Sequence, residues 1–130
     1  MRWRRWKNKK DVDTYLLFGY RWCMHWKKIK SHPQYEIAKK QMKQGGGIVT
    51  VVLKNGVEGA SKFMDGLKMF SISANLADTR SIATHPATST HSKLTEEQRL
   101  EVGIEQGTVR LSIGLEHIDD ILADIQLALS

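Results

Sequence analysis

The sequence predicts an α+β fold in which helices pack on one face of an antiparallel sheet. The first observation is the length, because 130 residues suffice for one domain with its own hydrophobic core. The second is the order of patterned segments, which reads helix, strand, helix, two short strands, helix, strand, helix from residue 31 onwards. This order lacks the regular βαβ alternation of a parallel sheet, so a helix layer on an antiparallel sheet is expected.

The first elements of this order are a helix, a strand and a second helix. Ser31 is a candidate N-cap, Gln34 completes a capping box, and the Gly45–Gly47 run ends the first helix. The stretch GIVTVVLKNG (47–56) is rich in β-branched residues and closes with an Asn-Gly turn, as a strand does. A core helix follows, because apolar residues recur at helical spacing at Val57, Ala60, Phe63, Met64, Leu67 and Phe70.

Short elements fill the middle of the chain. SISANL (71–76) and SIATH (81–85) are strand candidates separated by a polar turn, and residues 86–94 form a loop. Thr95 then caps a helix, with Gln98 at the third position to complete a capping box.

A regular strand and an amphipathic helix end the chain. In residues 108–114, three apolar residues alternate with Arg110, Ser112 and Gly114, so one face of the strand belongs to the core. Asp119 and Asp120 lie in the first turn of the last helix, where the helix dipole favours carboxylates. The apolar stripe of this helix consists of Ile118, Ile121, Leu122, Ile125 and Leu129.

The positive charge is confined to the N-terminal segment. Residues 1–30 contain ten Lys/Arg and two Asp, a net charge of +8, whereas residues 31–130 contain ten Lys/Arg and twelve Asp/Glu, a net charge of −2. The same segment contains the single cysteine, Cys23, and all four tryptophans. One cysteine forms no internal disulfide, which fits a cytoplasmic protein. We therefore divide the chain into an anomalous basic, Trp-rich segment (1–30) and one domain (31–130).

Arg110 is the strongest candidate for a binding residue. A planar, permanently charged guanidinium suits bidentate capture of a carboxylate, although an arginine on a polar strand face also suits solvent or another domain. His85 and His91 have no cysteine or third ligand at metal spacing, so no metal site is predicted. The chain also lacks a P-loop lysine after its glycine run and a nucleophile elbow.

Four stretches of residues 31–130 resemble a known family. SHPQYEIAKKQM, GGGIVTVVL, ANLADTRSIATHPATSTHSKLTEEQR and VRLSIGLEHIDDILADI occur in the order and spacing of the C-terminal domain of pyridoxal-phosphate-dependent enzymes of cysteine and methionine metabolism. Within that family, the sequence around Asn75 and the stretch HPATSTHSKL are most similar to O-succinylhomoserine and O-acetylhomoserine sulfhydrylases. The resemblance implies the small C-terminal domain of a fold-type I pyridoxal-phosphate enzyme.

The resemblance also assigns roles to two residues. Arg110 matches the family arginine that binds the α-carboxylate of the amino-acid substrate, and Asn75 matches a position that helps to hold the same group. Ala77 departs from the family, which usually has glycine there. The substrate implied is an activated homoserine ester, and the family implies a homo-oligomer.

The resemblance implies that this chain alone has no catalytic or cofactor-binding residue. The family's Schiff-base lysine and phosphate-binding groups come from a large N-terminal domain, for which Lys62 and Lys93 are no substitutes. We therefore expect a truncated domain of a sulfhydrylase that makes homocysteine or cystathionine in methionine biosynthesis, inactive alone and binding no pyridoxal phosphate by itself. The alternatives are a methionine γ-lyase or cystathionine γ-synthase/lyase fragment, and a non-catalytic binding module.

Two interpretations of residues 1–30 remain open. A reading-frame shift explains both the mismatch with the family and the excess of tryptophan. The tryptophan codon TGG appears when an ATG codon followed by G is read one base out of frame. The rival is a basic, aromatic arm that binds nucleic acid or an anionic membrane. The sequence favours the frame shift, because the segment lacks the amphipathic period that such an arm would use.

Overall fold

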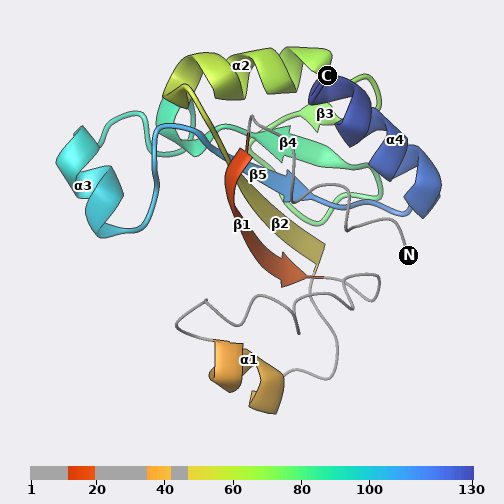
Figure 1. Ribbon diagram of the computed structural model, residues 1–130, viewed down its shortest axis with the longest axis horizontal. Coiled ribbons are helices and arrows are strands. Elements are labelled where there is room, and N and C mark those ends of the chain that lie inside the picture. The colour runs from red at the N-terminus through yellow and green to blue at the C-terminus, as the bar shows by residue number, and fades with distance from the viewer. Residues whose placement is uncertain (1–11, 20–34, 42–46) are drawn as a thin grey trace.

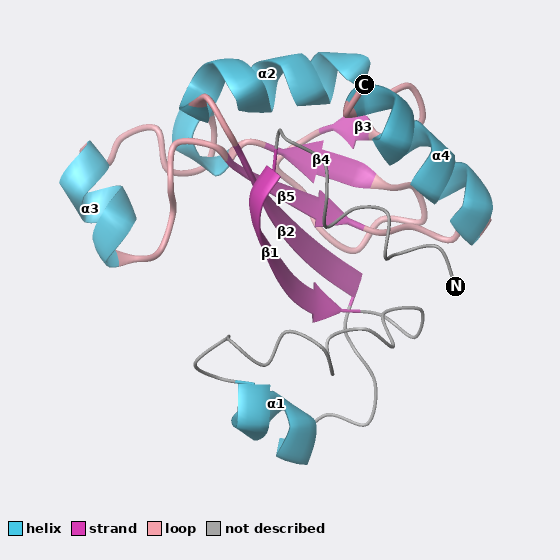
Figure 2. Ribbon diagram, viewed as in Figure 1, coloured by secondary structure: helices cyan, strands magenta, loops and turns pink. Residues whose placement is uncertain are grey.

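The computed structural model describes residues 12–19, 35–41 and 47–130, which form one five-stranded sheet and its helices (Figure 1). The strand order across the sheet is β1-β2-β5-β4-β3. Figure 2 shows these strands as one twisted layer. Their bounds are Val12–Gly19 for β1, Gly47–Leu53 for β2, Ser71–Ile72 for β3, Ile82–Thr84 for β4 and Thr108–Ser112 for β5.

The α+β prediction is confirmed, with one correction to the strand directions. The pairs β1-β2, β2-β5 and β4-β5 are antiparallel, but β3 and β4 pair in parallel. A parallel pair requires the chain to return to the end of the sheet from which it started. Residues 73–81 make that return, so the sheet is mixed at this edge.

The helices have the bounds Tyr35–Gln41 for α1, Gly56–Gly66 for α2, Glu96–Glu101 for α3 and Ile118–Ala128 for α4, with a short 3-10 helix, η3, at Pro86–Thr88. Helices α2 and α4 lie side by side over one face of the sheet, as predicted, whereas α1 and α3 lie outside this layer (Figure 1). No helix in the described ranges has the length and apolar character needed to cross a membrane.

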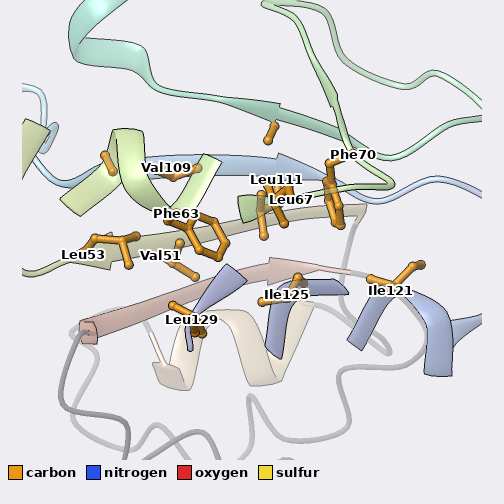
Figure 3. Packing of buried hydrophobic residues seen from close by; sticks show 12 residues of the cluster. Val51, Leu53, Phe63, Leu67, Phe70, Val109, Leu111, Ile121, Ile125 and Leu129 are labelled. Atoms are coloured by element: carbon orange, nitrogen blue, oxygen red, sulfur yellow. The ribbon is translucent and has the colours of Figure 1, made fainter. Parts of the chain in front are cut away.

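The main core lies between the sheet and the layer of α2 and α4 (Figure 3). Helix α2 is shorter than the sequence predicts, because Leu67 adopts an extended conformation and ends it. Phe70 is still buried, whereas Val57 is 37% exposed and lies outside the core. The buried cluster consists of Val51, Leu53, Ala60, Phe63, Leu67, Phe70, Ala83, Val109, Leu111, Ile121, Ile125 and Leu129.

Asp124 fixes α4 to the segment that follows α2. Asp124 is 8% exposed, and its carboxylate accepts hydrogen bonds from the backbone N–H groups of Lys68 (2.8 Å) and Met69 (2.9 Å). Beside it the two helices approach so closely that a Cβ on Gly66 would collide with Ala128. A buried carboxylate with two backbone donors is a satisfied structural group.

Two local predictions can be compared with the structure at the helix and strand ends. The capping box of α3 is confirmed: Gln98 N–H donates to Thr95 Oγ1 (3.3 Å) and Thr95 N–H donates to Gln98 Oε1 (3.0 Å). The predicted turn after β2 is also present, with Asn55 in the left-handed region at a φ of 64°. Other predictions fall outside the described residues, namely those on the four tryptophans Trp3, Trp6, Trp22 and Trp26, and on Cys23, Ser31, Gln34, Gly45 and Gly46.

Strand β1 is the element that the sequence analysis missed. It pairs with β2 along its whole length, with an irregularity between Val12 and Thr14, and it forms the edge of the sheet. The charge and tryptophan content of residues 1–30 do not indicate a strand, but the stretch VDTYLLFG contains strand-forming residues.

Candidate functional site

Arg110 lies on the face of the sheet opposite the α2 and α4 layer. In β5 it stands between Thr50 of β2 and Thr84 of β4, and its side chain is half-buried. Its Nη2 donates to the carbonyl oxygens of Ala74 (2.9 Å) and Asn75 (3.4 Å), and to Thr84 Oγ1 (3.3 Å). One nitrogen of the guanidinium is therefore held by the protein on three sides.

The other nitrogens of Arg110 are not used in the same way. Nε is buried and has no hydrogen-bond partner, and Nη1 donates to no residue in the described part of the chain. A guanidinium carries five N–H donors, and a buried donor without an acceptor costs about 1–3 kcal/mol. The arrangement presents a positive charge with free donors, which an anion such as a carboxylate would satisfy.

The loop after β3 forms one wall of this site. Its start is attached to β4, since Ser73 N–H donates to the carbonyl of Ala83 (3.2 Å). Its far end is attached to β5, since Ala77 N–H donates to Ser112 Oγ (3.2 Å). Two hydrogen bonds from loop N–H groups to the sheet thus fix the loop whose carbonyls hold Arg110.

Ala77 adopts a conformation that favours glycine. Its φ is 57°, in the left-handed region that non-glycine residues rarely occupy. The family that the sequence resembles usually has glycine at this position. The turn is nevertheless formed around Ala77.

The structure brings together the two site residues that the sequence predicted. Asn75 and Arg110 are 35 positions apart, and the Asn75 carbonyl accepts from Arg110 Nη2. The backbone N–H of Asn75 donates to Ser73 Oγ (3.2 Å), and the residue is exposed. The backbone of Asn75 thus contacts the guanidinium, and the residue is open to solvent.

Thr84 and Ser112 are contributors that the sequence analysis missed. Both are buried, with exposures of 2% and 3%. The alternation in β5 places Ser112 on the same face as Arg110, and the antiparallel register places Thr84 directly opposite Arg110. The alternation was readable from sequence, but the register was not, because it depends on which strands pair.

A second polar cluster supports the strand ends beside this site. Glu116 accepts hydrogen bonds from Ser81 N–H (2.6 Å) and Ser81 Oγ (2.8 Å), and Ser81 Oγ accepts from Gly114 N–H (2.9 Å). Desolvation raises the pKa of Glu116, but the hydrogen bonds from the backbone N–H groups of Ser81 and of Glu116 itself and from the Ser81 hydroxyl together outweigh it, so the pKa lies below its usual range.

A short turn next to this cluster contains a second shifted carboxyl. The backbone N–H of Arg80 donates to Asp78 Oδ1 (3.0 Å), and Thr79 Oγ1 donates to the same oxygen (3.3 Å). The Arg80 hydrogen bond, more than the nearby charge, lowers the pKa of Asp78. Both carboxylates accept hydrogen bonds from residues 79–81, directly before β4.

The histidines have structural partners in the described part of the chain. His85 is buried and engages Thr88 Oγ1 (2.8 Å) and the Gln106 carbonyl (2.7 Å), and His91 engages Thr90 Oγ1 (2.8 Å). Among the described residues, no group of three or more His, Cys, Asp or Glu is placed to hold a metal ion.

Comparison with known proteins gives a family match over most of the chain. The sequence model of the family "Cys/Met metabolism PLP-dependent enzyme" matches residues 23–130. The L-methionine γ-lyase of Pseudomonas putida is 48% identical over 106 residues, which are 82% of this chain and 27% of that protein. The O-acetyl-L-homoserine sulfhydrylase of Leptospira meyeri is 48% identical over 103 residues, 78% of this chain and 23% of that protein.

A solved structure supports the same match. It comes from Campylobacter jejuni, is described as an O-acetylhomoserine (thiol)-lyase and carries a pyridoxyl-lysine. Its TM-score is 0.80 at 31% identity, over 95% of this chain and 27% of that chain. The chain thus spans about a quarter of the length of the relatives that it matches.

Proposed function

Because this chain belongs to the pyridoxal-phosphate-dependent enzymes of cysteine and methionine metabolism, we propose that residues 31–130 are the domain of such an enzyme that binds the substrate carboxylate. In this proposal Arg110 forms charge-assisted hydrogen bonds with the α-carboxylate of an amino acid, and Asn75 contributes beside it. The observation that carries the proposal is the guanidinium itself. Its Nη2 is anchored by three acceptors, while its buried Nε has none.

The residues described here do not fit the family's cofactor by themselves. Pyridoxal phosphate is held through a lysine, and cofactor lysines are commonly desolvated. Every lysine in the described ranges is exposed, including Lys62 and Lys93. We therefore derive no chemical step at the cofactor from this chain, and we propose carboxylate binding and orientation as its contribution.

Two reactions are candidates for the whole enzyme. We propose first a sulfhydrylase that acts on an activated homoserine ester, in agreement with the sequence around Asn75 and with the sulfhydrylases among the relatives. A methionine γ-lyase is the second candidate, because the lyase of Pseudomonas putida is as similar to this chain as the Leptospira sulfhydrylase is. Carboxylate capture by Arg110 serves both, since both substrates are amino acids.

A domain exchange tests the proposal. Residues 31–130 would replace the matching C-terminal segment of the Leptospira sulfhydrylase, and in parallel that of the Pseudomonas lyase. We expect the first chimera to retain replacement with O-acetylhomoserine and sulfide better than the second retains methionine elimination. The opposite order would favour the lyase. Chimeras that fold and load the cofactor but turn over neither substrate would contradict carboxylate binding by this domain.

We propose separately that the segment 1–30 is read in a shifted frame over the part that precedes the family match, which begins at residue 23. The support is the segment's charge of +8 and the clustering of all four tryptophans. Pairing of β1 with β2 is compatible with this origin, because a sheet edge binds a strand through backbone hydrogen bonds. Sequencing the DNA upstream of codon 31 tests the proposal. An adjacent frame that encodes the missing family sequence supports it, and an intact frame through the segment in related genes contradicts it.

A further inference from the structure

Thr84 links the loop after β3 (residues 73–81), called the loop wall below, to the guanidinium of Arg110. It lies opposite Arg110 in the β4-β5 register and is 2% exposed. Its hydroxyl donates to the Ser73 carbonyl and accepts from Arg110 Nη2 at 3.3 Å. One buried hydroxyl therefore contacts both the start of the loop and the charged group that the loop surrounds.

The two hydrogen bonds of Thr84 depend on each other. A hydroxyl has one hydrogen, and here that hydrogen points to the Ser73 carbonyl, so a lone pair faces Arg110. The other two acceptors of Nη2 are carbonyls of Ala74 and Asn75, which directly follow Ser73 in the same loop. Thr84 thus orients Arg110 directly and also helps to hold the loop that supplies the remaining acceptors.

We propose that Thr84 is a positioning residue for carboxylate binding. By fixing Nη2, it sets the plane of the guanidinium and therefore the direction in which the remaining N–H donors point. This inference rests on the proposed function of Arg110. It adds that the orientation of the guanidinium, and not its charge alone, is set within this domain by a threonine hydroxyl.

The chain offers a matched control in Thr108. Thr108 is also a buried threonine, 5% exposed, and it lies in β5 two residues before Arg110. Its hydroxyl accepts from Glu105 N–H (3.0 Å) instead of from the guanidinium. Thr84→Val and Thr108→Val each remove one buried hydroxyl with little change of shape, and only the former removes an acceptor of Arg110 Nη2.

The first measurement needs no ligand. In the full 130-residue chain, labelled at arginine, NMR resonances of the Arg110 guanidinium report how strongly rotation of Nη2 is restricted. We expect restricted rotation in the unaltered chain, in Thr84→Ser, which keeps the hydroxyl, and in Thr108→Val, but averaged signals in Thr84→Val. Averaged signals in the unaltered chain, or equal signals in Thr84→Val and Thr108→Val, would overturn the inference.

The second measurement separates positioning from binding. The affinity for L-methionine is compared with the affinity for L-methioninamide, which lacks the carboxylate. Both ligands are titrated separately into the same four proteins and into Arg110→Lys. We expect carboxylate-dependent binding to weaken about tenfold in Thr84→Val, as for one hydrogen bond to a charged group, and to recover in Thr84→Ser. If Arg110→Lys weakens binding but Thr84→Val does not, the positioning role is wrong and the proposed function stands. If the unaltered chain does not distinguish the two ligands, or Arg110→Lys binds normally, carboxylate binding itself is wrong.

Discussion

The two faces of the sheet are stabilised by different interactions. On the face covered by α2 and α4, residues such as Phe63 and Leu111 are almost fully buried in an apolar cluster. On the opposite face, Thr84 and Ser112 are buried to a similar degree, but they are polar and hydrogen-bonded to the loop after β3. Among the residues that the structure describes, the one buried side-chain nitrogen or oxygen without a hydrogen-bond partner, Arg110 Nε, lies on the polar face. That difference locates the candidate site.

The largest expected effect is on the apolar face. Phe63→Ala removes a ring that is 2% exposed from the centre of the cluster, and we expect a loss of about 3–5 kcal/mol in the free energy of unfolding. Urea denaturation of the full chain measures this loss. Leu127→Ala is the control, because Leu127 lies in α4 but is 59% exposed, and its change should stay within about 0.5 kcal/mol. Equal losses in both variants would contradict the assignment of the core to this face.

The second effect is on the polar face and concerns activity. In the chimera with the Leptospira sulfhydrylase, Arg110→Lys keeps the charge but loses the planar fork of donors. Breaking a desolvated charge-assisted pair costs about 2–5 kcal/mol, so kcat/KM for the amino acid should fall roughly thirty-fold or more. Arg99→Lys is the control, because the Arg99 guanidinium bonds the Leu94 carbonyl (2.6 Å) beside α3. An unchanged kcat/KM in Arg110→Lys would mean that Arg110 is structural.

The third effect is a pH dependence at the edge of the polar face. Because the pKa of Glu116 is lower in the folded chain than in the unfolded chain, its carboxylate contributes stability above the unfolded pKa. This contribution is lost as the pH falls through the folded pKa. Thermal unfolding of the unaltered chain and of Glu116→Gln, followed from neutral pH to about pH 3, should therefore show the difference between them shrink in acid. A difference that is constant with pH would show that the Ser81 hydrogen bonds do not depend on the charge.

The two faces also differ in how much of them the sequence predicts. Helix α4, strand β2 and the capping box of α3 depend on neighbours within a few residues, so periodicity and capping signals are enough to predict them. Asp124 was missed because its donors, Lys68 and Met69, are more than fifty positions away. Local patterns contain no information on such pairs.

The candidate site shows the same limit. Alternation in β5 predicts that Arg110 is on the polar face, and the family resemblance adds Asn75. The role of Thr84 could not be predicted, because it requires the register of β4 on β5 and the return of residues 73–81 across the strand ends. The polar face is thus built from contacts between distant segments, and its details require the structure.

The smallest expected effect is at Ala77, which ends the loop wall. A left-handed conformation costs an alanine about 1–2 kcal/mol, and glycine avoids this cost but adds about 0.4–1 kcal/mol of entropy to the unfolded chain. We therefore expect Ala77→Gly to raise the free energy of unfolding by less than about 1 kcal/mol, and Ala77→Val to lower it, because β-branched residues rarely adopt a positive φ. Urea denaturation measures both.

The hydrogen bond from residue 77 N–H to Ser112 Oγ involves only the backbone at that position, so glycine preserves it. A destabilised Ala77→Gly would indicate that the alanine side chain contributes to the loop wall, and that the wall is held by packing as well as by its hydrogen bonds to the sheet.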